Sequence, residues 1–204
     1  MSISKKIKDA VKEVGLMNEL CEHLRQIGIK STLLESGSPE AMGPRWKKSI
    51  LASSYVLGCI KIEDRNIDLV QVGRLGDPQS HLKYEYHYVV RAIGEGLEDK
   101  LWAKTKPIGP VDFQWEGGYL AQLLNADSDL QDMLLRAGSN RLAISPDKKN
   151  RCVRITPIPA GWTTIMVGPI SIPALGREAF PTREAFEAYD RIAQHIRSIA
   201  NAQP

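Results

Sequence analysis

The sequence predicts an α+β fold, in which amphipathic helices from the N- and C-terminal ends cover one face of an antiparallel sheet. Three patterns support this prediction. Strand-like segments follow one another between residues 54 and 93, separated by short turns. Residues 82–93 (LKYEYHYVVRAI) alternate between an apolar and a mostly polar face, which favours an antiparallel sheet with one solvated face. Both ends of the chain place apolar residues at helical spacing.

The composition is that of an ordinary globular domain. The chain has 204 residues, of which 43% are hydrophobic and 25% charged, so a core can form without disulfides or metals. We interpret residues 1–204 as a single α+β domain, because no linker rich in Gly, Ser or Pro divides them. The alternative is a subdivision near residues 108–118.

Cysteine usage and the N-terminus point to the cytoplasm. The three cysteines are odd in number, far apart and outside any zinc-binding spacing, and residues 1–14 lack the pattern of a secretory signal. The uncharged residues 155–176 are long enough to span a bilayer, but their prolines would break such a helix. We therefore expect a cytoplasmic protein with no membrane segment, no metal site and no cofactor.

The N-terminal region predicts one amphipathic helix, or two divided at Gly15, ending at Gly28. Its apolar stripe fits the sheet of the same chain, and pairing with a second subunit is the alternative. Residues 29–34 predict a short strand, and the proline and glycine content of residues 35–48 predicts a loop.

The middle of the chain predicts most of the sheet. Residues 54–62, 66–75 and 82–93 form a three-stranded meander in this interpretation. Residues 101–107 predict a fourth strand, with a short helix as the alternative, and residues 111–116 alternate like a further strand.

Two helices should follow, the first with Tyr119, Leu120, Leu123 and Leu124 on one face and the second carrying Leu130, Met133 and Leu134. Asp127 or Ser128 can cap the second of them, and Gly138 can end it.

The C-terminal third predicts more strands and a final helix. Residues 140–145 and 151–157 read as a hairpin, and residues 162–168 as one more strand of the sheet. The last helix opens at Pro181-Thr182, and its apolar residues recur at three- and four-residue spacing, which predicts packing on the sheet.

The polar face of residues 82–93 is the first candidate site. Glu85, His87 and Arg91 share this face, and a histidine beside a carboxylate can act as a general base because the carboxylate stabilises the imidazolium. Such neighbours are also common on any solvated sheet, so we expect water over this face rather than catalysis.

The opposite face of the same strand carries Tyr84, Tyr86 and Tyr88. These tyrosines can form the wall of a packed core or line a ligand cavity between sheet and helix. The apolar Leu82 and Val90 on the same face favour the core.

A basic cluster in the predicted loop is the candidate for nucleic-acid binding. Arg45, Lys47 and Lys48 surround Trp46, which could stack on a base beside a phosphate. The alternative is a tryptophan that anchors the loop to the core, and the small, dispersed net charge of +3 does not favour nucleic acid as a partner.

Cys152 lies near Arg151 and Arg154, which would favour a reactive thiolate, but a buried structural cysteine is the simpler interpretation.

No motif with a known catalytic mechanism is present: the chain lacks a Walker loop, GxGxxG, HExxH, GxSxG and an EF-hand loop. The leading functional hypothesis is therefore a non-catalytic binding or interaction module that self-associates. The first alternative is a small-molecule-binding protein or enzyme with a pocket between sheet and helix. The second is a weak nucleic-acid binder that also uses Lys148, Lys149 and Arg151.

Overall fold

The computed structural model defines the backbone over most of the chain. The described backbone comprises residues 3–35, 38, 45–47, 53–74, 84–91, 93–108, 113–139, 141–157, 164–167, 170–173 and 180–202. The described side chains are those of residues 15–35, 38, 56–73, 85–91, 93–108, 113–139, 141–157 and 180–202.

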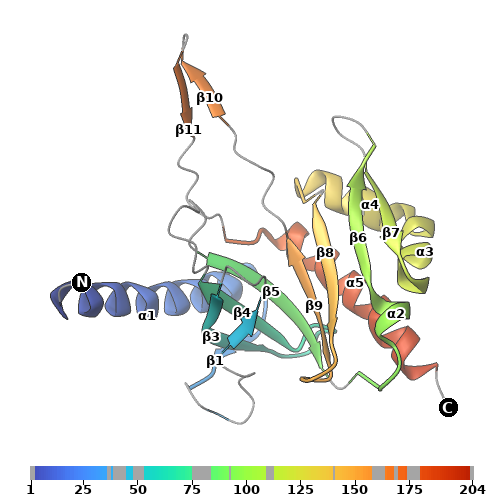
Figure 1. Ribbon diagram of the computed structural model, residues 1–204, viewed down its shortest axis with the longest axis horizontal. Coiled ribbons are helices and arrows are strands. Elements are labelled where there is room, and N and C mark those ends of the chain that lie inside the picture. Colours follow the sequence, from blue (N-terminus) through green and yellow to red (C-terminus); the bar gives the residue numbers. More distant parts are fainter. Residues whose placement is uncertain are drawn as a thin grey trace.

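Within these residues, nine strands form one antiparallel sheet (Figure 1). Its order is β1-β3-β4-β5-β9-β8-β6-β7, and β2 also pairs with β3. The strands are β1 (Ser31–Leu33), β2 (Arg45–Lys47), β3 (Ser53–Ile62), β4 (Leu69–Arg74), β5 (Tyr84–Arg91), β6 (Ala103–Pro107), β7 (Phe113–Gly117), β8 (Leu142–Asp147) and β9 (Cys152–Pro157). Together with the terminal helices, this sheet confirms the predicted α+β class.

The predicted meander is present as β3, β4 and β5, and the predicted hairpin as β8 and β9. The strand predicted at residues 101–107 forms as β6, preceded by the short helix α2 (Glu98–Leu101), so both alternatives for this segment are realised. The order of the strands in the sheet could not be predicted from the sequence, because β9 and β8 insert between β5 and β6.

Two expectations about strands were wrong. Residues 45–47, predicted to lie in a loop, form β2 on the edge of β3. The strand predicted at residues 162–168 forms as β10 (Thr164–Val167), but it pairs with β11 (Ile170–Pro173) in a separate two-stranded sheet instead of extending the main one. Two segments this close in sequence pair at a lower cost in loop-closure entropy than distant ones.

Helices from both ends of the chain pack on one face of the sheet, as predicted (Figure 1). The first, α1 (Ile3–Gln26), runs through Gly15 without a break. It ends before Gly28, whose φ of 86° is the left-handed conformation that favours glycine at a helix end. Met17, Leu20 and Leu24 of α1 are buried in the shared core, so this part of the helix docks on its own chain.

The last helix, α5 (Arg183–Asn201), is anchored over the centre of the sheet. The Thr182 hydroxyl caps it by accepting a hydrogen bond from the Ala185 amide at 3.2 Å. Its aromatic residues Phe186 and Tyr189 lie 5.9 and 4.6 Å, centroid to centroid, from the ring of Tyr88 in β5. The predicted apolar stripe of this helix therefore packs against the sheet and covers the core.

Polar contacts fix α5 at its sides. Asp190 accepts hydrogen bonds from the Asn66 and Ile67 amides, at 2.7 and 3.0 Å, and so holds the turn between β3 and β4. The helices α3 (Tyr119–Ala126) and α4 (Ser128–Arg136) complete this layer. No helix in the described part of the chain is both long enough and apolar enough to cross a membrane.

Candidate functional site

The sheet face turned away from the helices carries a buried layer of polar side chains. The strand registers place Gln71 beside His87, and Arg154 beside Val89, on this face. Gln71, Glu85, His87 and Arg154 are only 0%, 6%, 4% and 8% exposed. The expectation of water over Glu85 and His87 was wrong, because alternation along a strand identifies its polar face but not whether that face is covered.

His87 is held between two protein groups. Its Nδ1 lies 2.7 Å from the Thr156 hydroxyl, and its Nε2 lies 3.3 Å from a carboxylate oxygen of Glu85. Whether Nδ1 or the Thr156 hydroxyl donates in the first contact depends on the tautomer of the ring. The structure thus brings Glu85 and His87 together, as their shared face predicted.

Arg91 does not join this pair. It lies four residues beyond His87, or about 13 Å along an extended strand. Its register partner is Cys152, and its backbone amide donates to the Asp68 carboxylate at 2.6 Å. The polar face therefore has two separate ends, with Glu85 and His87 at one and Arg91 at the other.

A second buried chain of contacts runs across the strands from β3 to β8. Gln71 Nε2 lies 3.7 Å from Cys59 Sγ, and Arg154 Nε lies 3.4 Å from Gln71 Oε1. Arg154 also forms an ion pair with Asp147. Burial alone would raise the pKa of Asp147, but hydrogen bonds from Arg154 and Asn150 outweigh it and hold that pKa below its usual value.

The tyrosine face is packed in its centre. Tyr88 is 2% exposed and contacts two aromatic rings of α5, and burial raises the pKa of its hydroxyl well above the usual value. Tyr86 is half-buried and packs against the same core, whereas the side chain of Tyr84 lies outside the described residues. At Tyr88, the core interpretation is the one that fits.

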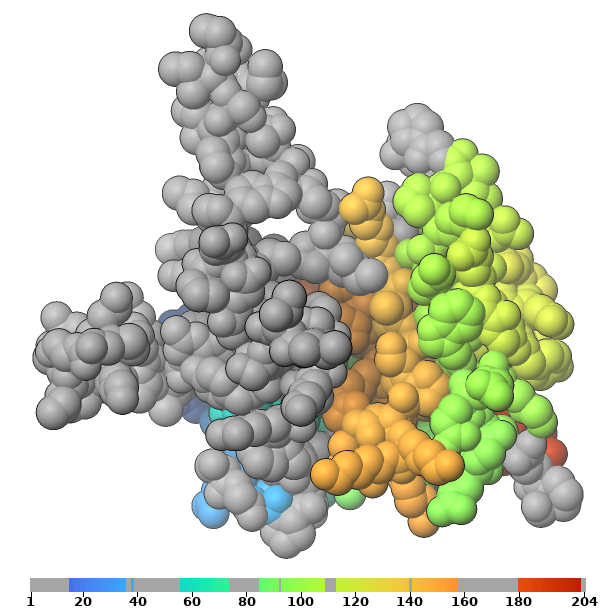
Figure 2. Space-filling view, viewed as in Figure 1, coloured from blue at the N-terminus to red at the C-terminus, as the bar shows by residue number. Residues whose placement is uncertain are grey.

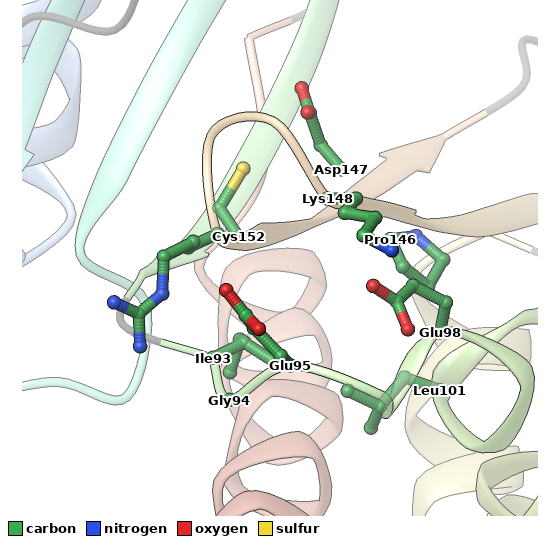
Figure 3. Close-up of a pocket in the computed structure, with 10 residues that line it drawn as sticks. Ile93, Gly94, Glu95, Glu98, Leu101, Pro146, Asp147, Lys148 and Cys152 are labelled. Atoms are coloured by element: carbon green, nitrogen blue, oxygen red, sulfur yellow. The ribbon is translucent and has the colours of Figure 1, made fainter.

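A shallow hollow opens at the end of the sheet where β5 leaves it and β9 enters (Figure 3). It is open to solvent, and the space in it that a water-sized molecule can occupy is about 10 Å³. The hollow is lined by residues of three segments, namely the chain after β5, both ends of α2 and the β8–β9 turn: Ile93, Gly94, Glu95, Glu98, Leu101, Pro146, Asp147, Lys148, Arg151 and Cys152. Figure 2 shows the β8–β9 residues in orange beside the green α2 and β6 residues on this side of the molecule.

The β8–β9 turn is tightly built around Asp147. Its carboxylate accepts hydrogen bonds from the Asn150 amide at 3.1 Å and from the Asn150 side chain at 2.7 Å. Arg151 has a φ of 47°, the left-handed region, and its carbonyl accepts from the Ile93 amide at 3.1 Å. Because Asp147 also holds Arg154, the turn connects the hollow to the buried polar chain.

The hollow combines an apolar floor with a charged rim. Ile93, Leu101 and Cys152 are buried, at 5%, 0% and 2% exposure. Burial raises the pKa of the Cys152 thiol to about 11, despite the opposing effect of Arg154, so the thiol stays protonated at neutral pH.

The residues that line the hollow carry charges of both signs. Glu95 and Glu98 come from the α2 side, and Lys148 and Arg151 come from the β8–β9 turn. Among the described side chains, none of these four makes an ion pair within 4.0 Å.

The nucleic-acid candidates lie in two separate segments, and Lys148 and Arg151 of the second segment line the hollow. Arg45, Trp46 and Lys47 make up β2 at the edge of β3, but their side chains lie outside the described residues, as does Lys48 altogether. Among the described residues, no group of three or more His, Cys, Asp or Glu side chains is placed to hold a metal ion.

Sequence reasoning missed two features. The hollow arises only because β9 pairs with β5, which brings the turn at residues 146–151 against residues 93–98. The second is Asp127, which accepts hydrogen bonds from Arg191 and His195 of α5 in addition to capping α4. Only the capping role of Asp127 could be predicted from the sequence, because a helix cap depends on neighbouring residues.

Comparisons of the chain with protein-family models, with curated proteins and with solved structures find no match.

Proposed function

We propose that this chain is a non-catalytic binding module that holds its ligand in the hollow between α2 and the β8–β9 turn. One observation carries the proposal: the hollow has charges of both signs on its rim, unpaired with one another, above an apolar floor. Binding sites in proteins typically combine apolar walls with a few charged or polar groups that orient the ligand.

The chemistry of the neighbouring groups supports binding rather than catalysis. A general base needs a ring nitrogen that can reach the substrate, and both nitrogens of His87 already face protein groups. A cysteine nucleophile needs a thiolate, and burial keeps Cys152 protonated.

Filling the hollow tests this function. Gly94 lines it without a left-handed φ, and a Cβ there would meet only Leu97 at 3.7 Å, an ordinary contact. The variant Gly94→Trp places a large side chain at this lining position to obstruct the hollow, and Gly94→Ala is the matched control.

Thermal denaturation is measured for all three proteins against a library of small anions, cations and zwitterions. Compounds that raise the Tm of the wild type and of Gly94→Ala should leave Gly94→Trp unchanged. Equal effects on the three proteins, or no effect of any compound, would refute the proposal.

An enzyme is the second candidate. The Thr156 hydroxyl, the His87 ring and the Glu85 carboxylate follow one another in the order of a nucleophile, a base and an orienting acid. Hydrolysis of activated esters that is lost in Thr156→Val and kept in Ser145→Ala would favour this candidate, and equal rates in both variants would end it.

Self-association and a cytoplasmic location remain part of the proposal. Trp102 and Tyr119 are 44% and 50% exposed, and large exposed aromatic residues are enriched in protein interfaces. Analytical ultracentrifugation at high micromolar concentration should show a dimer, and a monomer there would contradict it. Nucleic-acid binding would appear as salt-sensitive retention on heparin, and no retention at low salt would remove that alternative.

A further inference from the structure

We infer that the sheet face over β6, β7 and β8, on the side turned away from the helices, binds single-stranded nucleic acid. This inference goes beyond the proposed function, because it concerns residues outside the lining of the hollow. The face is called the open face below, and its exposed or half-buried polar and aromatic residues are Trp102, Lys104, Lys106, Gln114, Glu116 and Arg141.

Side chains along β6 alternate between the core and the open face. Ala103 is buried, whereas Trp102 is 44% exposed and the side chains of Lys104 and Lys106 are 51% and 63% exposed. Trp102 directly precedes β6 in extended backbone, so parity places it in one row with the two lysines. The Lys104 ammonium lies 5.9 Å from the centre of the Trp102 ring, which confirms that both lie on the same side.

The neighbouring strands add one cation and one carboxylate to this row. Lys104 pairs in register with Ala143 of β8, and Arg141, which is exposed, precedes Ala143 by two residues. The same register therefore places Arg141 on the open face beside Lys106. From β7, the Glu116 carboxylate lies 3.7 Å from the Lys104 ammonium and 3.0 Å from that of Lys106. The row thus has three cations against one carboxylate.

An extended polyanion that carries aromatic bases matches this row. The two lysines of β6 are two residues apart, or about 7 Å along an extended strand, so phosphates of one strand can contact both. Trp102, at the end of the row, offers an exposed ring on which a base of any identity can stack. An acidic peptide would meet the cations but leave this ring without a stacking partner.

The carboxylates on this face do not prevent binding. Glu116 shares its one charge between two lysines, and ion pairs as exposed as these contribute little to stability. The next charged groups on the face, Asp147 and Arg154, form an ion pair and neutralise each other. Glu116 therefore weakens the attraction for phosphate without removing it.

The number of cations sets the expected strength of binding. With three phosphate contacts, the logarithm of the association constant should fall with the logarithm of the salt concentration with a slope of about −2, because each contact to a single strand contributes about −0.7. Binding without base specificity predicts a dissociation constant on the order of 10–100 μM at low salt.

The test titrates the full chain into a fluorescently labelled octathymidylate and follows the anisotropy at low salt, with octauridylate beside it to compare RNA with DNA. An abasic oligomer of the same length keeps the phosphates and lacks the bases. It should bind about tenfold more weakly than octathymidylate. Trp102→Ala should weaken octathymidylate about tenfold and leave the abasic oligomer unchanged. Equal binding of both oligomers to the wild type, or binding of neither, would overturn the inference.

Charge variants supply the second arm. Lys104→Gln/Lys106→Gln should weaken octathymidylate and reduce the magnitude of the salt slope by about 1.4, whereas Glu116→Gln should strengthen binding because it removes a repulsive charge. The control Lys30→Gln/Arg136→Gln removes two exposed cations that also pair with carboxylates, but on other elements. Equal binding by the two double variants would contradict the assigned surface. Circular dichroism verifies that each variant is folded.

Two further measurements separate this inference from its alternatives. If a peptide of eight glutamates binds as tightly as octathymidylate, the partner is an acidic peptide and the inference fails. Trp102 is also one of the two exposed aromatic residues in the proposed self-association, so Tyr119→Ala removes the other. Tyr119→Ala should bind octathymidylate like the wild type, and a loss equal to that of Trp102→Ala would overturn the stacking role.

Discussion

Replacing Asp127 by Asn should weaken the polar contacts that hold the start of α4 against α5 and so lower the free energy of unfolding. The Asp127 carboxylate accepts two hydrogen bonds of 2.7 Å from Arg191 and one of 2.8 Å from His195. It also caps α4 through the Leu130 amide at 3.1 Å. Asparagine is an equally good cap, so the substitution isolates the charge.

The pKa of Asp127 gives the magnitude. Burial alone would raise it, but the hydrogen bonds from Arg191, His195 and the Leu130 amide outweigh burial and lower the pKa from 3.8 to about 2. A shift of that size corresponds to about 2 kcal/mol of stabilisation. Since the Arg191 side chain is 36% exposed and partly screened by water, we expect a loss of about 1–2 kcal/mol in Asp127→Asn at pH 7.

The sign of the pH dependence follows from the same shift. A carboxyl whose pKa is lower in the folded state stabilises the protein fully above its unfolded pKa near 3.8, and this stabilisation is lost as the pH falls through about 2. The free energies of unfolding of wild type and Asp127→Asn should therefore converge between pH 4 and pH 2. Urea denaturation followed by circular dichroism at several pH values measures the free energy of unfolding of both proteins.

The exposed Asp132 of the same helix supplies the control. Its side chain is 67% exposed, so Asp132→Asn should change the free energy of unfolding by less than about 0.5 kcal/mol. A difference between Asp127→Asn and wild type that does not vary between pH 7 and pH 2 would refute the reasoning.

Three further predictions concern the packing of the helices and are checked by urea denaturation. Phe186→Ala should cost about 3–5 kcal/mol, because the ring is fully buried, and a loss below about 1 kcal/mol would contradict the described core. Gly118→Ala should cost about 3 kcal/mol or more, since a Cβ would overlap the backbone oxygen of Asp99, and near-native stability would refute that close approach. Thr182→Ala should cost about 1 kcal/mol through loss of the cap on the Ala185 amide, whereas Thr182→Ser should be nearly neutral; equal losses in both would argue against the cap.

Most helices and strands were predictable, because their signals are local. The alternation of residues 84–91, the cap at Thr182 and the stop at Gly28 each depend on a few neighbouring residues, and each is found in the structure. The insertion of β9 beside β5 was not predictable, because strand pairing between distant segments depends on the whole sheet.

The candidate site was predictable only in part. The shared face of Glu85 and His87 follows from their spacing, but the Thr156 contact and the burial of the pair require β9 to lie next to β5. The rim of the hollow comes from two segments about 50 residues apart, 93–98 and 146–151. Each segment reads as an ordinary charged turn, so neither alone indicates a site.

The most direct test of the binding function is a titration of methyl-labelled protein followed by NMR. On addition of a compound that raises the Tm of the wild type, the account predicts progressive shifts of the Ile93 and Leu101 methyl signals, because both residues line the hollow. The signals of Ile192 and Ile196, on the buried face of α5, should stay in place. Unchanged Ile93 and Leu101 signals with every such compound would contradict the account.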